Sequence, residues 1–234
     1  MTRLAESSWT DVARLSGAGD VLLLPLGSTE QHGPHLPVTT DTDIAVAVAT
    51  GAAGRNPHLV VAPPMAYGSS GEHQGFAGTL SLGQEAMELV LLELVRSAST
   101  HFAHVVVVSA HGGNAGPLSR AMARLRDEGR PVAAWSPPWH GDLHAGRTET
   151  SLMVAIAPDR VRLDRAEAGD LRPLALLLPL LREHGVRSVS ANGVLGDPSG
   201  ATADEGRRLL RDAVYDLVGV VERLRAVPTM EVTE

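Results

Sequence analysis

Short apolar runs separated by longer mixed segments recur along the chain. Four runs are rich in Val, Leu or Ala: Val21 to Leu26, His58 to Ala62, His104 to Ser109 and Pro131 to Trp135. Their length is typical of strands, and the unbroken Val run in the third predicts a strand buried on both faces, as in parallel sheets. The pattern therefore predicts at least four strands.

Apolar residues at helical spacing fill the segments between and after these runs. In the last one, Asp204 to Ala226, the side chains of Leu210, Val214, Leu217 and Val221 share one face, which predicts an amphipathic surface helix. The predicted helices are Trp9 to Leu15, Asp41 to about Gly51, Gln84 to Ala98, Gly116 to Glu128, Glu149 to Ala157, Leu171 to His184 and Asp204 to Ala226.

The alternation of strands and helices predicts an α/β fold with a mostly parallel sheet covered by helices on both faces. We expect one domain over all 234 residues, with residues 227–234 as a frayed tail. At the start of the first long helix, Thr40 followed three residues later by Asp43 resembles a capping box.

Composition excludes several function classes. The net charge of -7 without a basic patch argues against a nucleic-acid partner, and no apolar run is long enough to span a bilayer. Cysteine is absent and every basic residue is arginine, so thiolate ligands, disulfides and Schiff-base lysines are excluded. The first twelve residues lack the apolar segment of a signal peptide, so we expect a cytoplasmic protein.

Four polar residues each follow a predicted strand or begin the helix after it: Glu30, His32, Asp41 and His111. The carboxyl ends of parallel strands share one edge of a sheet, where ligands bind. Carboxylate and imidazole together suit Zn, Fe or Mn, and a pair of ions needs a bridging carboxylate. Asp41 suits that role because a helix N-terminus favours an ionised carboxylate. Singly, each residue is also compatible with an ordinary polar loop position.

Other candidates carry a weaker signal. His144 follows the fourth predicted strand and is interpreted either as a general acid/base or as a surface-loop histidine. Glu149 could complete a second metal site, accept a hydrogen bond from a ligating histidine, or only begin a helix. Glu72 and His73 lie in a long glycine-rich loop that could cover the site or simply be mobile.

The segments GSTEQHGPHLP…TTD, HGGN and HAGRTETS, in that order, resemble the creatininase (creatinine amidohydrolase) family over Trp9 to about Glu205. The resemblance implies a metal-dependent hydrolase of amide or amidine C–N bonds with a three-layer α/β/α sandwich fold. It also implies a homo-oligomer, commonly a hexamer. No nucleic-acid or membrane partner is expected.

The same resemblance assigns roles to the candidate residues. Glu30 and His111 would hold one metal ion, His32 would hold the other, and Asp41 would bridge the two. His144 matches the histidine taken as catalytic in creatininase itself. We therefore expect one or two divalent ions (Fe, Zn or Mn) in each subunit.

One position departs from the family pattern. Creatininase has a glutamate ligand two residues after the histidine that corresponds to His111, and this chain has Gly113 there. The second metal site would then be weak, empty or completed by Glu149. The departure also argues against creatinine as the substrate.

Two further segments, ETSLMVAIAP and NGVLGDPSGATADEG, are most similar to the mycofactocin-system branch of the family. That likeness implies a peptidase that releases a C-terminal dipeptide derived from Val and Tyr from a modified precursor peptide. The alternatives are a small-molecule amidohydrolase or deformylase of the same family, and a non-catalytic metal-binding domain.

Overall fold

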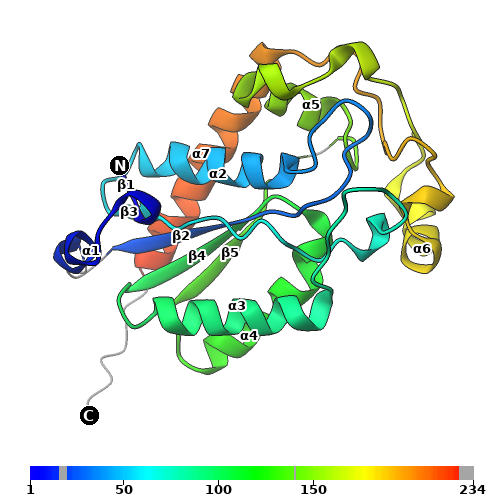
Figure 1. The fold of residues 1–234 in the computed structure, drawn as a ribbon. Coiled ribbons are helices and arrows are strands. Elements are labelled where there is room, and N and C mark those ends of the chain that lie inside the picture. The colour runs from blue at the N-terminus through cyan, green and yellow to red at the C-terminus, as the bar shows by residue number, and fades with distance from the viewer. Residues whose placement is uncertain (16–19, 140, 227–234) are drawn as a thin grey trace.

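The centre of the protein is a parallel five-stranded sheet in the order β1-β3-β2-β4-β5 (Figure 1). A computed structural model describes residues 1–15, 20–139 and 141–226. The central strands are β2 (Val21–Leu26) and β4 (His104–Ser109), flanked by β3 (Leu59–Val61) and β5 (Val132–Trp135). Every pairing between the described strands is parallel, which confirms the predicted sheet. The edge strand β1 (Thr2–Arg3) was not predicted, because two residues carry no periodic signal.

Helices cover both faces of this sheet, as Figure 1 shows. One layer contains α2 (Thr40–Ala53), α5 (Arg147–Ile156) and α7 (Ala203–Arg225). The opposite layer contains α3 (Gln84–Ala98) and α4 (Ala115–Asp127). This arrangement confirms the expected three-layer α/β/α sandwich.

The strand residues alternate between two hydrophobic cores. Leu23 and Val106 pack in the core shared with α2, α5 and α7, whereas Leu22 and Val107 pack in the core shared with α3 and α4. All residues of β2 and β4 are buried. A strand with both faces covered needs apolar residues at every position, which explains the unbroken Val and Leu runs.

The remaining described elements are two helices and six short 3-10 helices. They are α1 (Trp9–Leu15), α6 (Leu174–His184) and the short 3-10 helices η1 (Leu4–Glu6), η2 (Gly71–His73), η3 (Gly112–Asn114), η4 (Pro158–Arg160), η5 (Leu163–Arg165) and η6 (Val186–Ser188). No helix in the described part of the chain is long and apolar enough to cross a membrane.

The predicted capping box is wrong. The helix begins one residue earlier than predicted, and the Thr40 hydroxyl donates a hydrogen bond backwards to the carbonyl of Pro37 (2.7 Å). The Thr39 hydroxyl instead donates to the Asp43 carboxylate (2.8 Å). The predicted tail, residues 227–234, lies outside the described residues. The single-domain organisation stays a prediction.

The contact between α5 and α7 gives a test of the packing. A Cβ atom at Gly206 would lie 1.9 Å from the backbone oxygen of Ser151, whereas one at Gly219 on the same helix would meet only the flexible end of Arg223. We predict that Gly206→Ala lowers the free energy of unfolding by about 1–3 kcal/mol through overpacking. Gly219→Ala should raise it by roughly 0.5–1 kcal/mol, because alanine favours a helix. Denaturant titration of both variants measures this, and equal effects would contradict the close packing.

Candidate metal centre

The predicted site residues meet beyond the carboxyl ends of β2 and β4. Glu30 and His32 lie in the loop after β2, His111 follows β4, and Asp41 is in the first turn of α2. The side chains of Glu30, His32 and Asp41 are at most 1% exposed, and that of His111 is 6% exposed. The shared sheet edge therefore brings together groups as far apart in sequence as Glu30 and His111, which are 81 positions apart.

Asp41 lies between two histidines. Its Oδ1 atom is 3.3 Å from His32 Nε2, and its Oδ2 atom is 3.5 Å from His111 Nδ1. Glu30 Oε2 lies 3.1 Å from His111 Nε2. Each carboxylate oxygen of Asp41 thus faces a different imidazole, which is the arrangement that a bridging carboxylate requires.

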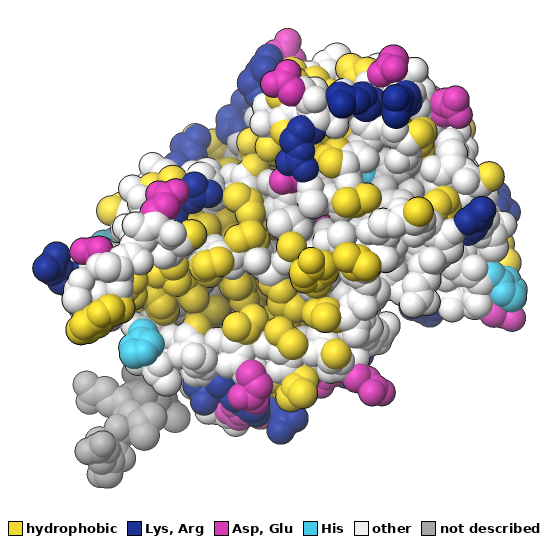
Figure 2. Space-filling view, viewed as in Figure 1, with side chains coloured by type: hydrophobic (Ala, Val, Ile, Leu, Met, Phe, Trp, Pro, Cys, Tyr) yellow, Lys and Arg dark blue, Asp and Glu magenta, His cyan; other side chains and the backbone are white. Residues whose placement is uncertain are grey.

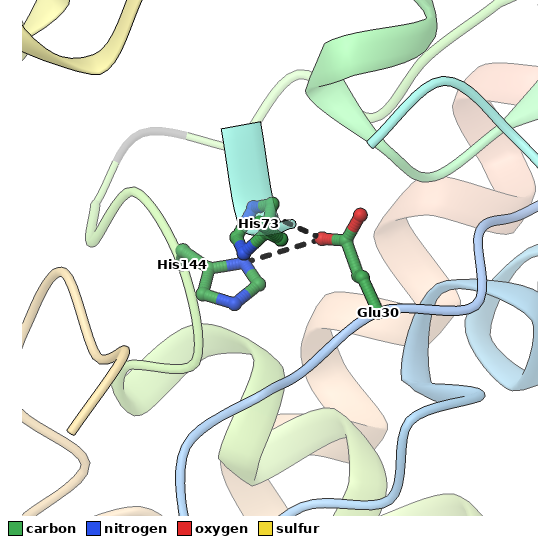
Figure 3. A group of neighbouring side chains, drawn as sticks. All are labelled: Glu30, His73 and His144. Atoms are coloured by element: carbon green, nitrogen blue, oxygen red, sulfur yellow. Dashed lines mark ion pairs between the residues drawn. The ribbon is translucent and has the colours of Figure 1, made fainter. Parts of the chain in front are cut away.

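Two more histidines face the other oxygen of Glu30. His73 Nε2 is 3.4 Å and His144 Nδ1 is 3.6 Å from Glu30 Oε1, as Figure 3 shows. Three groups of residues could each hold a metal ion, because the potential ligand atoms within each group lie within 4.8 Å of one another. They are Glu30 with Asp41 and His111, His32 with His144 and Glu149, and Glu30 with His73 and His144.

The side chain of Gln31 determines which nitrogen of His73 carries the proton. The backbone N–H of Gly33 donates to Gln31 Oε1 (2.8 Å), which fixes the orientation of the amide. The amide nitrogen then donates to the carbonyl of Gly193 (3.0 Å) and to His73 Nδ1 (2.9 Å). Because Nδ1 accepts, neutral His73 carries its proton on Nε2, directed at Glu30. The protonated Nε2 atom of His73 therefore faces Glu30 Oε1 at 3.4 Å, although the geometry does not make a hydrogen bond.

His144 has the opposite arrangement. A carbonyl only accepts, so His144 Nε2–H donates to the backbone oxygen of Gln31 (2.7 Å). The unprotonated Nδ1 atom then faces Glu30 and is free to take up a proton or to bind a cation. His144 is 7% exposed, so the interpretation as a surface-loop histidine is wrong.

The backbone beside His144 is held in an uncommon conformation. Ala145 has φ of 53°, in the left-handed region that residues with a Cβ atom rarely adopt. The Glu149 carboxylate accepts a hydrogen bond from the Ala145 N–H (2.6 Å), and its Oε2 atom is 3.9 Å from His32 Nε2. Glu149 therefore supports the His144 loop and reaches the His32 side of the site.

Burial changes the acidity of these groups. The pKa of Glu30 is raised well above its usual range, first by burial and then by the negative charges of Asp41 and Glu72. For His32 burial disfavours the charged form, yet the Asp41 carboxylate outweighs it and raises the pKa to about 9. Burial, with the charge of nearby His32, lowers the pKa of His144 well below its usual range. Without a cation, these shifts favour protonated Glu30 and protonated His32, so the cluster offsets its negative charge by holding protons.

The donor atoms fit a divalent cation. Both carboxylate oxygens of Glu30, Asp41 Oδ2 and His32 Nε2 are buried and have no hydrogen-bond partner among the described residues. Buried charged groups without a partner are costly unless they are paired or coordinate a metal. Oxygen and imidazole donors suit Zn, Mn or Fe. The fold and these donors together define a metal-binding α/β protein with its site at the sheet edge.

The sequence indicated Glu72 and His73 only as residues of a glycine-rich loop that could cover the site, without a contact to the predicted ligands. Gln31 was missed. Gln31 gave no signal, because its role depends on contacts with Gly193 and His73 that come from distant segments.

Comparison with known proteins agrees with this class. The family model described as Creatininase: Creatinine amidohydrolase matches residues 5–221. A relative from Mycobacterium ulcerans (strain Agy99), named mycofactocin precursor peptide peptidase, is 49% identical over 230 residues, covering 94% of this chain and 92% of that protein. The chain belongs to the creatininase family and is a hydrolase of that family.

Solved structures share the fold. A crystal structure of creatinine amidohydrolase (creatininase) aligns with a TM-score of 0.83 and 25% identity over 97% of this chain and 99% of that chain. A structure described as creatininase Mn aligns with a TM-score of 0.82 and 26% identity over 97% and 99% of the two chains. A variant creatininase described as Zn-Zn type aligns with a TM-score of 0.80 and 25% identity over 96% and 98%. These structures and the donor set support a divalent metal as the cofactor.

Proposed function

We propose that this chain is a metal-dependent peptidase that releases the C-terminal dipeptide derived from Val and Tyr from the modified mycofactocin precursor peptide. The name of the Mycobacterium ulcerans relative and its 49% identity over nearly the whole of both chains support the substrate. The observation that carries the chemistry is the buried set of carboxylate and imidazole atoms that lack hydrogen-bond partners within the described part of the chain.

We assign the candidate metal ligands to two neighbouring positions. Glu30 and His111 would hold one ion (Fe, Zn or Mn), and His32 with Glu149 would hold the other. Asp41 would serve both, because its two oxygens face His111 and His32 separately. A bound divalent cation supplies Lewis acidity toward the scissile carbonyl and makes water a better nucleophile.

His144 is the residue that we assign to proton transfer. Its Nδ1 atom faces the site while Nε2–H is held by the Gln31 carbonyl, so the free nitrogen can take a proton from the attacking water and then pass it to the leaving nitrogen of the amide. The neutral form is available at physiological pH because burial lowers the pKa of His144. The hydrogen bond from Ala145 to Glu149 keeps the loop that carries His144 in place.

Assembly and location are further parts of the proposal. The family resemblance implies a homo-oligomer, commonly a hexamer. Figure 2 shows apolar side chains gathered on the face between α2 and α3. Large exposed apolar side chains include Leu89 in α3 and Tyr67 and Leu82 in the segment before it. Contact with further copies would bury such a surface. A cytoplasmic location is the accompanying prediction from the cysteine-free sequence.

Removal of metal tests the proposed activity. We expect chelation to abolish release of the dipeptide product from the modified precursor peptide, and Zn, Fe or Mn to restore it. Mass spectrometry of the products measures the release. Creatinine and a small formylated amide serve as comparison substrates for the alternative amidohydrolase and deformylase functions. Full turnover of the peptide by metal-free protein would contradict the mechanism, and turnover of only a small amide would favour the alternative.

Substitution of His144 separates proton transfer from metal binding. His144→Ala should retain its metal and lose turnover by about 10²–10⁴-fold, the usual contribution of a positioned acid or base. Elemental analysis of the purified variant and its kcat on the precursor peptide are the two measurements. Loss of metal from this variant would show instead that His144 is a ligand.

A further inference from the structure

The space beside Gly113 is already filled. A Cβ atom at this position would lie 2.4 Å from Glu72 Oε1, 2.4 Å from His111 Nε2 and 2.5 Å from the backbone oxygen of Ser69. The Ser69 carbonyl is backbone and cannot move aside cheaply. Position 113 therefore excludes a side chain, and the carboxylate of Glu72 occupies part of the space that such a side chain would take.

The segment that carries Glu72 is anchored to the metal centre. Glu72 lies in η2, in the long connection after β3. Just before it, the Ser69 N–H donates to Asn114 Oδ1 (2.9 Å), and Asn114 Nδ2 donates to the carbonyl of Gly27 (3.0 Å). Asn114 is fully buried. These bonds tie the start of the η2 segment to the loops that follow β2 and β4.

The carboxylate of Glu72 is directed at the site. Its Oε1 atom is 3.6 Å from His111 Nε2, which donates a hydrogen bond to the Ser69 carbonyl (3.0 Å) and leaves His111 Nδ1 as the nitrogen free to bind a cation. The side chain of Glu72 is 30% exposed, so the group reaches inward from the rim. Within the described residues His111 is its ion-pair partner, and no arginine neutralises it. On the inner side of His111, the buried oxygens of Glu30 and Asp41 Oδ2 also lack hydrogen-bond partners among the described residues.

We infer that Glu72 is a further carboxylate ligand of the metal ion held by Glu30, Asp41 and His111, taking over the space of a side chain at Gly113. The inference rests on the proposed metal-dependent function. With Glu149 on the His32 side, the site then has four carboxylates, from Glu30, Asp41, Glu72 and Glu149. Their formal negative charge balances the positive charge of two divalent cations.

Glu149 does not substitute for Glu72 in this role. The Glu149 Oε2 atom is 3.9 Å from His32 Nε2 and is held by the Ala145 N–H. Glu72 lies beside His111, which contacts the other oxygen of Asp41. The two glutamates therefore serve opposite sides of the centre.

The test is a Mn²⁺ titration of the metal-free full-length protein, with electron paramagnetic resonance used to measure free Mn²⁺. We expect Glu72→Gln to raise the dissociation constant roughly 10–100-fold, the size of effect usual for residues that support a metal site. Glu167→Gln is the matched control, because it removes the same charge from an exposed position. It should bind Mn²⁺ as the unmodified protein does. Circular dichroism of each variant verifies that the fold is retained.

A third variant, His111→Ala, separates the possible failures. If unmodified protein and His111→Ala bind Mn²⁺ equally, the proposed metal site itself is wrong. If His111→Ala loses Mn²⁺ while Glu72→Gln binds as tightly as the unmodified protein, the metal site stands and the role of Glu72 is overturned. A raised KM for the peptide with an unchanged Mn²⁺ dissociation constant would likewise overturn it, since Glu72 would then contact the substrate instead.

Discussion

The burial of negative charge with only partial compensation by protein groups is the constraint on which the site depends. Glu30 and Asp41 are almost completely removed from solvent, and the chain has no lysine to pair with them. Ionised carboxylates in such surroundings are costly unless a cation or a protonated partner compensates them. The histidines around them act as partial compensation, since the charge of Asp41 raises the pKa of His32 to about 9 despite its burial. A divalent cation would supply that compensation in full.

The parallel sheet makes this concentration of charge possible. Its two central strands are buried and entirely covered by helices, so polar residues are displaced to the loops at the strand ends. The loops after β2 and β4 open at the same edge, and the first turn of α2 brings Asp41 back toward them. Hydrogen bonds between the loops then hold the polar groups in place. The Asn114 side chain bonds to the backbones of Ser69 and Gly27, and the Gln31 side chain bonds to His73 and to the Gly193 carbonyl.

Much of this architecture could be predicted from the sequence, because it follows from periodicity. The apolar runs predicted β2 and β4 to the residue, and the sheet edge rule placed Glu30, His32, Asp41 and His111 together. The rest depends on contacts between segments distant in sequence. Nothing local to the glycine-rich loop indicates that His73 points at Glu30.

Metal stoichiometry tests the central claim, which is that Asp41 joins two cation positions in one buried cluster. Elemental analysis should find that Asp41→Ala loses both ions, whereas His32→Ala loses only one, because each oxygen of Asp41 faces a different imidazole. Circular dichroism of the two variants provides the control for folding. Equal metal retention by the two folded variants would contradict a bridging role for Asp41 and with it the two-position account of the site.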